Sequence, residues 1–297
     1  MISILIPIYN YNAFPLVSEL VKQASFLKTD YEIICVDDAS KSPLNQDNEK
    51  INTLKNATFF SNKENLGYSS NRNFLVSISH FKYLLFIDGD SIITTNLYLK
   101  TYLDDLSKGF DIVYGGRIHP KSVANSNKRL RWKYGKFRED KPSSKRLKEP
   151  YKSLMFNNTL VNKQVFDSIQ FDIVTNKYGH DDTLFAYRAR LAQLKVGHID
   201  NSIMHADIDE NKAFLEKTHT SLKNLKYLSN QNLISVDFVK MLSIHNKLKH
   251  FKLNYLVMLF YLVFKDQMRL NLTSNTPSLK IYNLYRLSFF CYINRQK

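Results

Sequence analysis

The sequence predicts an α/β protein, with a mostly parallel sheet flanked by helices and a helical C-terminal region. The first two thirds of the chain alternate short apolar runs with helical patterns, as in α/β units around a parallel sheet. All eight glycines lie between Gly67 and Gly197, and beyond Gly197 the only helix breaker is Pro277. A stretch so poor in breakers and rich in Leu, Lys, Asn and Tyr favours helix. We place the boundary near residue 212, with an α/β domain over 1–212 and a helical region over 213–297.

Composition indicates a globular protein in a reducing compartment. The 297 residues are 44% hydrophobic and 23% charged, which is ordinary for a folded domain. Cys35 and Cys291 lie far apart, so they form neither a disulfide framework nor a metal knuckle. The N-terminus lacks a basic region and Pro7 interrupts its apolar run, which excludes a signal peptide. We therefore expect a cytoplasmic protein.

The net charge of +15 is unusual and is concentrated in two places. Residues 121–150 hold eleven Lys or Arg against three acids, and residues 211–297 hold fourteen against three. The rest of the chain is slightly acidic. Such basic regions suit nucleic acid, an anionic membrane or a phosphorylated substrate.

Two apolar runs near the N-terminus end in polar residues. Residues 3–10 (SILIPIYN) predict a strand that must end or reach an edge at Pro7, which has no N–H to donate. Residues 31–40 (YEIICVDDAS) predict a second strand, ending in paired acids. A carboxylate such as Asp38 at a strand end can accept hydrogen bonds from a nucleobase or ribose, or it can simply cap the turn.

The next two motifs carry an arginine and a second acid pair. In residues 65–73 (NLGYSSNRN), Gly67 permits a close backbone approach and Arg72 suits a diphosphate; taken alone, the segment is a loop with a helix cap. Residues 83–91 (YLLFIDGDS) predict a buried strand ending in Asp88 and Asp90. Two carboxylates one residue apart can share a hard cation, or they can form a polar turn.

These motifs together resemble family 2 glycosyltransferases of the GT-A fold, bacterial type. The resemblance rests on SILIPIYN, VDDAS, N-x-G-x-x-x-x-R-N and FIDGDS in this order, and it covers roughly residues 1–210. It implies a nucleotide-diphosphate sugar as donor, a divalent cation (Mn²⁺ or Mg²⁺) and an inverting displacement. The residues that the resemblance assigns to the donor site are Pro7 and Tyr9 at the nucleoside, Asp38 at the base or ribose, Gly67 and Arg72 at the nucleotide, and Asp88, which supports Asp90 at the metal and diphosphate.

The resemblance also implies a catalytic base in residues 178–185 (YGHDDTLF). The family usually has Glu-Asp here, and the second acid is the base, which corresponds to Asp182. Asp181 stands where the family has Glu, so its role is less defined and we place it toward the acceptor. Two like charges raise the pKa of one carboxylate, as a base requires. Asp182 can also cap the helix that follows it.

His205 ends a strand-like stretch (residues 196–205, VGHIDNSIMH), where family members often have a metal-ligating histidine. Without the resemblance, a histidine at a strand end is more often structural. We expect His205 to share the cation with Asp90, so that the cation neutralises charge on the departing diphosphate.

Residues 119–150 predict a long, basic acceptor loop, because they hold three prolines and show little periodicity. Trp132, the only tryptophan, can stack on a sugar or reach a lipid phosphate, or it can anchor a solvated loop. Asn157 and Asn158 precede the base motif, where the family often places acceptor-facing residues. The expected acceptor is a glycan or lipid-linked glycan in surface polysaccharide assembly.

The C-terminal region offers an apolar run, residues 253–264, that is too short to span a bilayer. Cations bracket it, so its helices can lie on an anionic membrane at the inner face of the cell membrane, or pack on the α/β domain or a partner. Two other classes remain open. A catalytically silent sugar-nucleotide-binding or scaffold protein would share the fold. A nucleic-acid-binding protein would explain the charge, but the chain shows no such motif and we expect no nucleic acid.

Overall fold

The computed structural model describes residues 1–173 and 178–295. It divides into two compact units. The first, here the sheet unit, comprises Met1–His119, Asp140–Asn176 and Asp181–Asp207. The second, here the helical unit, comprises Pro120–Glu139, Lys177–His180 and Ile208–Lys297.

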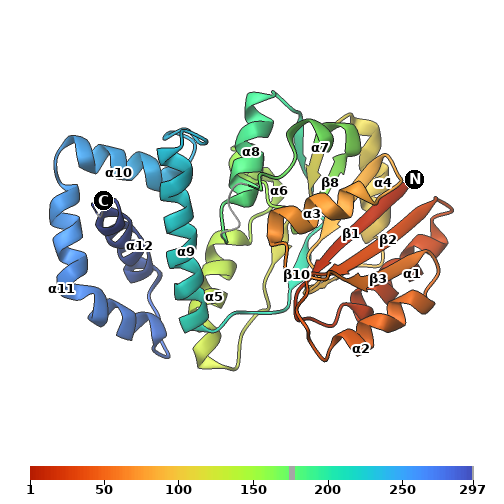
Figure 1. Cartoon of the computed structure of the whole chain (residues 1–297), viewed down its shortest axis with the longest axis horizontal. Coiled ribbons are helices and arrows are strands. Elements are labelled where there is room, and N and C mark those ends of the chain that lie inside the picture. Colours follow the sequence, from red (N-terminus) through yellow and green to blue (C-terminus); the bar gives the residue numbers. More distant parts are fainter. Residues whose placement is uncertain (174–177, 296–297) are drawn as a thin grey trace. The chain divides into compact units, whose positions relative to one another are not determined.

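The sheet unit is built on a seven-stranded, mostly parallel sheet of the described residues, as predicted (Figure 1). In spatial order its strands are β3 (Ala57–Ser61), β2 (Tyr31–Asp37), β1 (Ile2–Ile8), β4 (Tyr83–Ile87), β8 (Asn158–Asn162), β6 (Ile112–Tyr114) and β9 (Val196–His198). Only β8 runs antiparallel to its neighbours. The four strands from β3 to β4 are parallel, so their carboxyl ends meet at one edge of the sheet.

Burial on both faces explains why these strands are continuous apolar runs. All residues of β1 except Pro7 are buried, and so are most residues of β2 and β4. The β1–β4 ladder ends at the pair Leu5 and Phe86, whereas β1 stays paired with β2 through Ile8. Pro7 thus lies where β1 has a neighbour on one side only, which agrees with its missing N–H.

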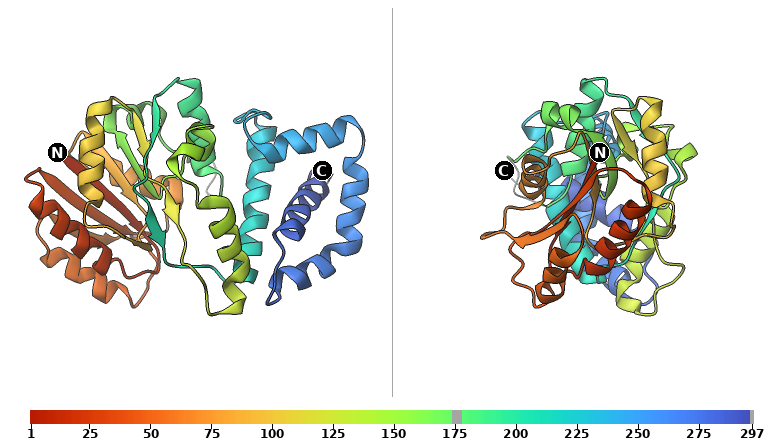
Figure 2. Two further views of the ribbon diagram at one scale, coloured as in Figure 1. Left: turned by 180° about the vertical axis from the view of Figure 1, so that it is seen from behind. Right: turned by 90° about the vertical axis from the view of Figure 1, so that its right-hand side faces the viewer.

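Helices cover the two faces of this sheet (Figures 1 and 2). Those of the sheet unit are α1 (Phe14–Phe26), α2 (Asn45–Asn48), α3 (Tyr68–Ser77), α4 (Tyr98–Asp105), α6 (Ser143–Arg146), α7 (Lys163–Ile169) and α8 (Asp181–Leu191). Helix α1 starts with a proline in its first turn and buries an apolar stripe on the sheet. A small second sheet pairs β5 (Ser91–Ile92), β10 (Ile203–His205) and β7 (Arg117–Ile118). It places His205 opposite Ser91.

The helical unit confirms that the C-terminal third is helical. It contains α5 (Arg129–Tyr134), α9 (Asn211–Asn230), α10 (Lys240–His250), α11 (Asn254–Thr273) and α12 (Leu279–Ile293). Helix α12 lies between α9 and α11 and buries aromatic residues such as Tyr285, Phe289 and Phe290 (Figure 1). Among the described residues, every helix falls short of the length and apolarity needed to cross a membrane.

The predicted loop over 119–150 differs from the structure, which is largely helical there. Helix α5 continues into a π-helical turn (Gly135–Glu139), and α6 follows. The structure also divides the segment, assigning Pro120–Glu139 to the helical unit, which resumes at Ile208. The reason is tertiary packing: the Tyr134 ring lies 5.7 Å from that of Phe214 and 5.5 Å from that of Tyr282. Partners so distant in sequence leave no local periodicity to read.

Candidate active site

The candidate site lies at the carboxyl ends of β1, β2 and β4, where the crevice of an open α/β sheet forms (Figure 1). The turn Asp88–Asp90 follows β4 directly. Its Gly89 N–H donates to the Pro7 carbonyl, and a Cβ at Gly89 would lie 3.2 Å from that oxygen. The close approach of two backbones therefore favours glycine between the two acids.

Arg72 is the centre of the site's ion pairs. It projects from α3 and is almost fully buried, with one guanidinium nitrogen 3.1 Å from Asp88 Oδ1 and the other 3.1 Å from Asp182 Oδ1. The guanidinium also lies 5.3 Å from the centre of the Phe171 ring. Arg72 thus joins two predicted site carboxylates that lie far apart in sequence.

The acids of the Asp88–Asp90 turn are in different electrostatic states. Burial raises the pKa of Asp88, an effect that Arg72 opposes and Asp90 strengthens. Burial also disfavours ionisation of Asp90. Even so, the pKa of Asp90 is lowered, because its hydrogen bond to His205, the charge of His205 and the charge of Arg117 outweigh burial.

Asp90 and His205 form a contact pair, as a shared cation would require. His205 Nδ1 lies 3.0 Å from Asp90 Oδ2, and the pairing of β10 with β5 fixes this approach. The His205 ring also packs edge-on against His119, with centroids 5.5 Å apart. A cation shared by the two residues would lie between these two atoms, His205 Nδ1 and Asp90 Oδ2.

The predicted base, Asp182, lies in the first turn of α8 and is held from both sides. Oδ1 pairs with Arg72, and Oδ2 accepts a hydrogen bond from the Phe156 backbone N–H at 3.1 Å. A carboxylate has about four lone-pair positions, so two remain free. Its neighbour Asp181 accepts from the Ser69 hydroxyl at 3.0 Å, and burial together with the charge of Asp182 raises the pKa of Asp181.

Asp38 is already engaged by the loop before α3. Its carboxylate accepts from the backbone N–H groups of Leu66 and Gly67, both at 2.8 Å, and from the Asn62 amide at 3.0 Å. Gly67 has a positive φ of 81°, which permits the sharp entry into α3. Asp38 therefore holds this loop in place, and one lone-pair position remains for a nucleoside.

Arg117 is the site residue that the sequence analysis missed. It lies on β7, with Nη2 4.0 Å from Asp88 Oδ2. When the Asn157 amide is oriented with its oxygen toward Arg117, that oxygen accepts from Nε at 2.8 Å and from Nη2 at 3.3 Å. The only signal in the sequence is its position directly after Gly115-Gly116, at a strand start.

The two asparagines predicted to face the acceptor behave differently. Asn157 joins Arg117, and its backbone carbonyl accepts from the Asp88 N–H. Asn158 is fully buried, and its amide oxygen accepts from the hydroxyls of Tyr98 and Tyr102 while its nitrogen donates to two backbone carbonyls. All four hydrogen-bonding positions of Asn158 are used inside the fold, so we correct its acceptor role to a structural one.

The remaining predicted residues fall on either unit. Pro7 is the last residue but one of β1, and Tyr9 follows that strand with its side chain exposed. Trp132 belongs to the helical unit, where its indole N–H donates to the Pro120 carbonyl at 2.9 Å and its ring contacts that of Phe137.

The donor set at Asp90 and His205 fits a cation that the substrate helps to coordinate. No group of three or more His, Cys, Asp and Glu among residues 1–173 and 178–295 is placed to hold a metal ion. Mg²⁺-type sites commonly use one or two protein carboxylates, with substrate phosphates and waters as the other ligands. One carboxylate and one imidazole agree with such an open site.

Comparisons with known proteins identify the family. The family model described as "Glycosyl transferase family 2" matches residues 3–179. Over 134 residues the chain is 37% identical to the poly(ribitol-phosphate) beta-glucosyltransferase of Bacillus spizizenii strain W23, a match that covers 41% of this chain. The match covers 21% of that protein, so the chain spans about a fifth of the curated relative.

Solved structures share the fold. S. aureus TarS 1-349 in complex with UDP-GlcNAc matches with a TM-score of 0.51 and 17% identity, over 73% of this chain and 64% of that one. The mannosyltransferase PcManGT from Pyrobaculum calidifontis, in complex with GDP-Man and Mn²⁺, matches with a TM-score of 0.52 and 13% identity, over 77% and 64%. At these identities the likeness shows the fold alone.

Proposed function

The chain belongs to glycosyl transferase family 2, and we propose that it transfers a sugar from a nucleotide-diphosphate sugar to an acceptor hydroxyl in an inverting, metal-dependent reaction. The observation that carries the proposal is the convergence on Arg72. This one buried cation joins Asp88, from the predicted metal-binding turn, to Asp182, the predicted base. This contact supports a single site that holds the proposed base and the proposed metal-binding turn.

The nucleotide-diphosphate donor is proposed to bind at the carboxyl ends of β1, β2 and β4. Pro7, Tyr9, Asp38 and Gly67 would surround the nucleoside, and Arg72 would approach the diphosphate. The structural neighbours were solved with UDP-GlcNAc and GDP-Man, which supports a donor of this class. Asp38 contributes mainly by shaping the loop, because most of its lone pairs are occupied.

Asp90 and His205 would hold the divalent cation, Mn²⁺ or Mg²⁺, which when bound supplies positive charge against the departing diphosphate. Arg72 adds a second positive charge on the same side, held rigidly by its two carboxylate partners. Asp88 orients Arg72 and contacts Arg117, so its proposed role is to support this cluster.

Asp182 is proposed to take the proton of the acceptor hydroxyl as that oxygen attacks the sugar. The hydrogen bonds from Arg72 and the Phe156 N–H fix the plane of the carboxylate and leave lone pairs for the acceptor. A direct displacement of this kind forms no covalent enzyme intermediate and inverts the anomeric configuration.

The acceptor is proposed to be a growing surface polysaccharide or a lipid-linked glycan. The relative named as a poly(ribitol-phosphate) beta-glucosyltransferase supports a hydroxyl-rich, phosphate-containing polymer. Asn157 and Asp181 are the proposed acceptor contacts of the sheet unit, and Trp132 is proposed separately as an acceptor contact of the helical unit. We further propose that the protein works in the cytoplasm, with the basic C-terminal helices peripheral on the inner face of the cell membrane.

A screen of nucleotide sugars tests the proposal. Purified protein is incubated with UDP-, GDP- and other nucleotide sugars, with and without Mn²⁺, while nucleotide release and thermal stability are measured. We expect one donor class to stabilise the protein and to be turned over only with the cation. Stabilisation without turnover, for any acceptor tried, would favour a silent sugar-nucleotide-binding protein. Salt-sensitive affinity for DNA or RNA with no donor effect would favour the nucleic-acid alternative.

A further inference from the structure

Helix α11 exposes an apolar stripe to solvent. Leu256, Leu259, Val263 and Leu270 recur at intervals of three, four and seven residues, so they share one helix face. Their relative exposures are 64%, 50%, 63% and 72%. We call these four residues the α11 stripe. Apolar side chains gathered on one helix face mark an interaction site more often than scattered single residues do.

The opposite face of α11 already supplies the packing that the fold needs. Tyr261, Met268 and Leu272 are buried there, against α12 and its neighbours. Helix α11 is therefore apolar on two faces, and only one is covered by the described residues. A helix apolar all round is normally buried, so the stripe calls for a partner outside this chain.

Exposed cations lie just before the α11 stripe in the chain. Lys247 and Lys249 are in the last turn of α10, and Lys252 lies in the turn before α11. The single acid of residues 240–273 is Asp266, which is exposed on the stripe's face of α11, three residues after Val263 and four before Leu270. In the described part of the chain, none of these three cations forms an ion pair. An apolar face with a cationic rim is complementary to an anionic lipid surface.

The same charges argue against a second copy of the chain as the partner. A twofold interface uses the same patch on both subunits, so the cationic rims would face each other across it. Like charges in apposition oppose association. A bilayer with anionic headgroups instead supplies both an apolar layer and the opposite charge.

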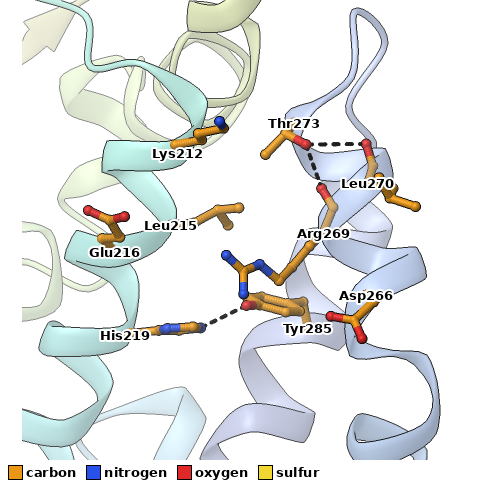
Figure 3. Close-up of a pocket in the computed structure, with 9 residues that line it drawn as sticks. All are labelled: Lys212, Leu215, Glu216, His219, Asp266, Arg269, Leu270, Thr273 and Tyr285. Carbon is orange, nitrogen blue, oxygen red and sulfur yellow. Dashed lines mark hydrogen bonds between the residues drawn. The ribbon is translucent and has the colours of Figure 1, made fainter.

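A groove next to the α11 stripe is not a competing candidate for binding an anion. A cavity of about 400 Å³ lies between α9, α11 and α12 (Figure 3). Its charged lining consists of Lys212 and Arg269 against Glu216 and Asp266, so cations and acids balance. Tyr285 and His219 also line it and hydrogen-bond to each other at 2.8 Å (Figure 3). Balanced charge gives this groove no preference for an anion, in contrast to the rim of the stripe.

We infer that the α11 stripe docks on an anionic membrane surface, with α11 lying in the plane of the interface and its cationic rim at the headgroups. This deepens the membrane placement given under the proposed function and does not depend on sugar transfer. The stripe is too limited to span the bilayer, so attachment is peripheral.

Sedimentation with vesicles tests the inference on the full chain. Vesicles of equal parts phosphatidylglycerol and phosphatidylcholine are compared with pure phosphatidylcholine, at low and high salt. We expect binding to the anionic vesicles that high salt weakens. The variant Leu256→Gln/Leu259→Gln/Val263→Gln should lose at least about tenfold in affinity, because each change removes inserted apolar surface. Glutamine is a good helix former, so circular dichroism should show α11 retained.

Two charge variants test the rim. Lys247→Gln/Lys249→Gln should weaken binding to anionic vesicles by about 25-fold, since each cation near the surface contributes about fivefold. Asp266→Asn should strengthen it by up to about fivefold.

Leu191→Gln is the matched control. Leu191 lies on α8 in the sheet unit and is 62% exposed, so it resembles the stripe residues in chemistry and exposure. It should leave vesicle binding unchanged.

Three results would overturn the inference: no preference for anionic vesicles, full binding by the triple variant, or a wild-type dimer that the triple variant dissolves. Transfer to a soluble acceptor should persist in the triple variant, so the failure of this inference and the failure of the proposed reaction are separable.

Discussion

The edge of the sheet and the surface of α11 contrast in what they bury. At the sheet edge, Arg72 is buried with carboxylates on either side, and Asp90 is held by His205. On α11, by contrast, leucines face solvent while cations just before them in the chain lack ion-pair partners in the described residues. Burying charge is costly unless it is paired, and exposing leucine forgoes the gain from burial.

The contrast indicates two kinds of ligand. A site that keeps buried, preorganised charges is suited to stabilise charge that develops during a reaction. A face that keeps apolar side chains and free cations is suited to adsorb on a surface that offers both apolar and anionic groups. We therefore expect chemistry to depend on the first region and location to depend on the second.

Substitution of Asp182 should have the largest effect on the chemistry that we assign to the sheet edge. Asp182→Asn removes the proposed base while keeping the side-chain shape, and turnover should fall by about 10²–10⁴-fold, the usual contribution of a general base. Donor affinity, measured by calorimetry, should change little. The matched control is Asp181→Asn, one residue earlier, where a smaller loss is expected. Equal turnover in Asp182→Asn and wild type would remove Asp182 from the mechanism.

Substitution of Arg72 should show how much the paired charges contribute to stability. Arg72→Met leaves Asp88 and Asp182 without their cation, and breaking a buried pair in this way costs about 3–5 kcal/mol of unfolding free energy. Urea denaturation followed by circular dichroism measures it.

Lys100→Met is the control for Arg72, because Lys100 pairs with Asp104 on an exposed face of α4. Its expected loss is below about 1 kcal/mol. Similar losses in the two variants would mean that the Arg72 pairs are no more important than surface ones.

The smallest predicted effect is a loss of folding stability at low pH, to which the imidazole of His219 in the helical unit should contribute. Burial, then the charges of Arg269 and Lys223, lower the pKa of His219 to about 4. The unfolded chain binds this proton near pH 6.5 and the folded chain does not, so stability falls as the pH drops from about 6.5 to about 4.

His219→Gln should flatten this decline, by no more than about 2 kcal/mol because the ring is partly exposed. Melting temperatures of both proteins across this pH range provide the measurement. Parallel curves would show that His219 does not contribute.

The sequence predicted the parts of the site that follow strands directly. Asp88, Asp90 and Asp38 come at the ends of apolar runs, and parallel strands bring such ends together, so their position at one sheet edge could be read locally. The contact of Arg72 with Asp182 could not, because it joins α3 to α8 across more than a hundred residues. Only the family resemblance linked them.

Other features had little or no local signal in the sequence. Arg117 reaches the site because β7 pairs with β10. Strands this short leave no pattern in the sequence from which their pairing could be predicted. The amide oxygen of Asn158 accepts hydrogen bonds from the hydroxyls of Tyr98 and Tyr102, which lie on α4, far from Asn158 in the sequence. Within 119–150, α5 forms against α9 and α12 and α6 against β9, so the stability of these helices comes from tertiary partners and not from periodicity.

The anomeric configuration of the product tests the central claim most directly. Once the donor is known, NMR of the first product formed shows whether the transferred sugar keeps or inverts the configuration that it has in the donor. A single displacement, with Asp182 as base and the diphosphate leaving from the opposite face, predicts inversion. Retention of configuration would contradict the account, since it would require a covalent or internal-return step that the arrangement around Arg72 does not provide.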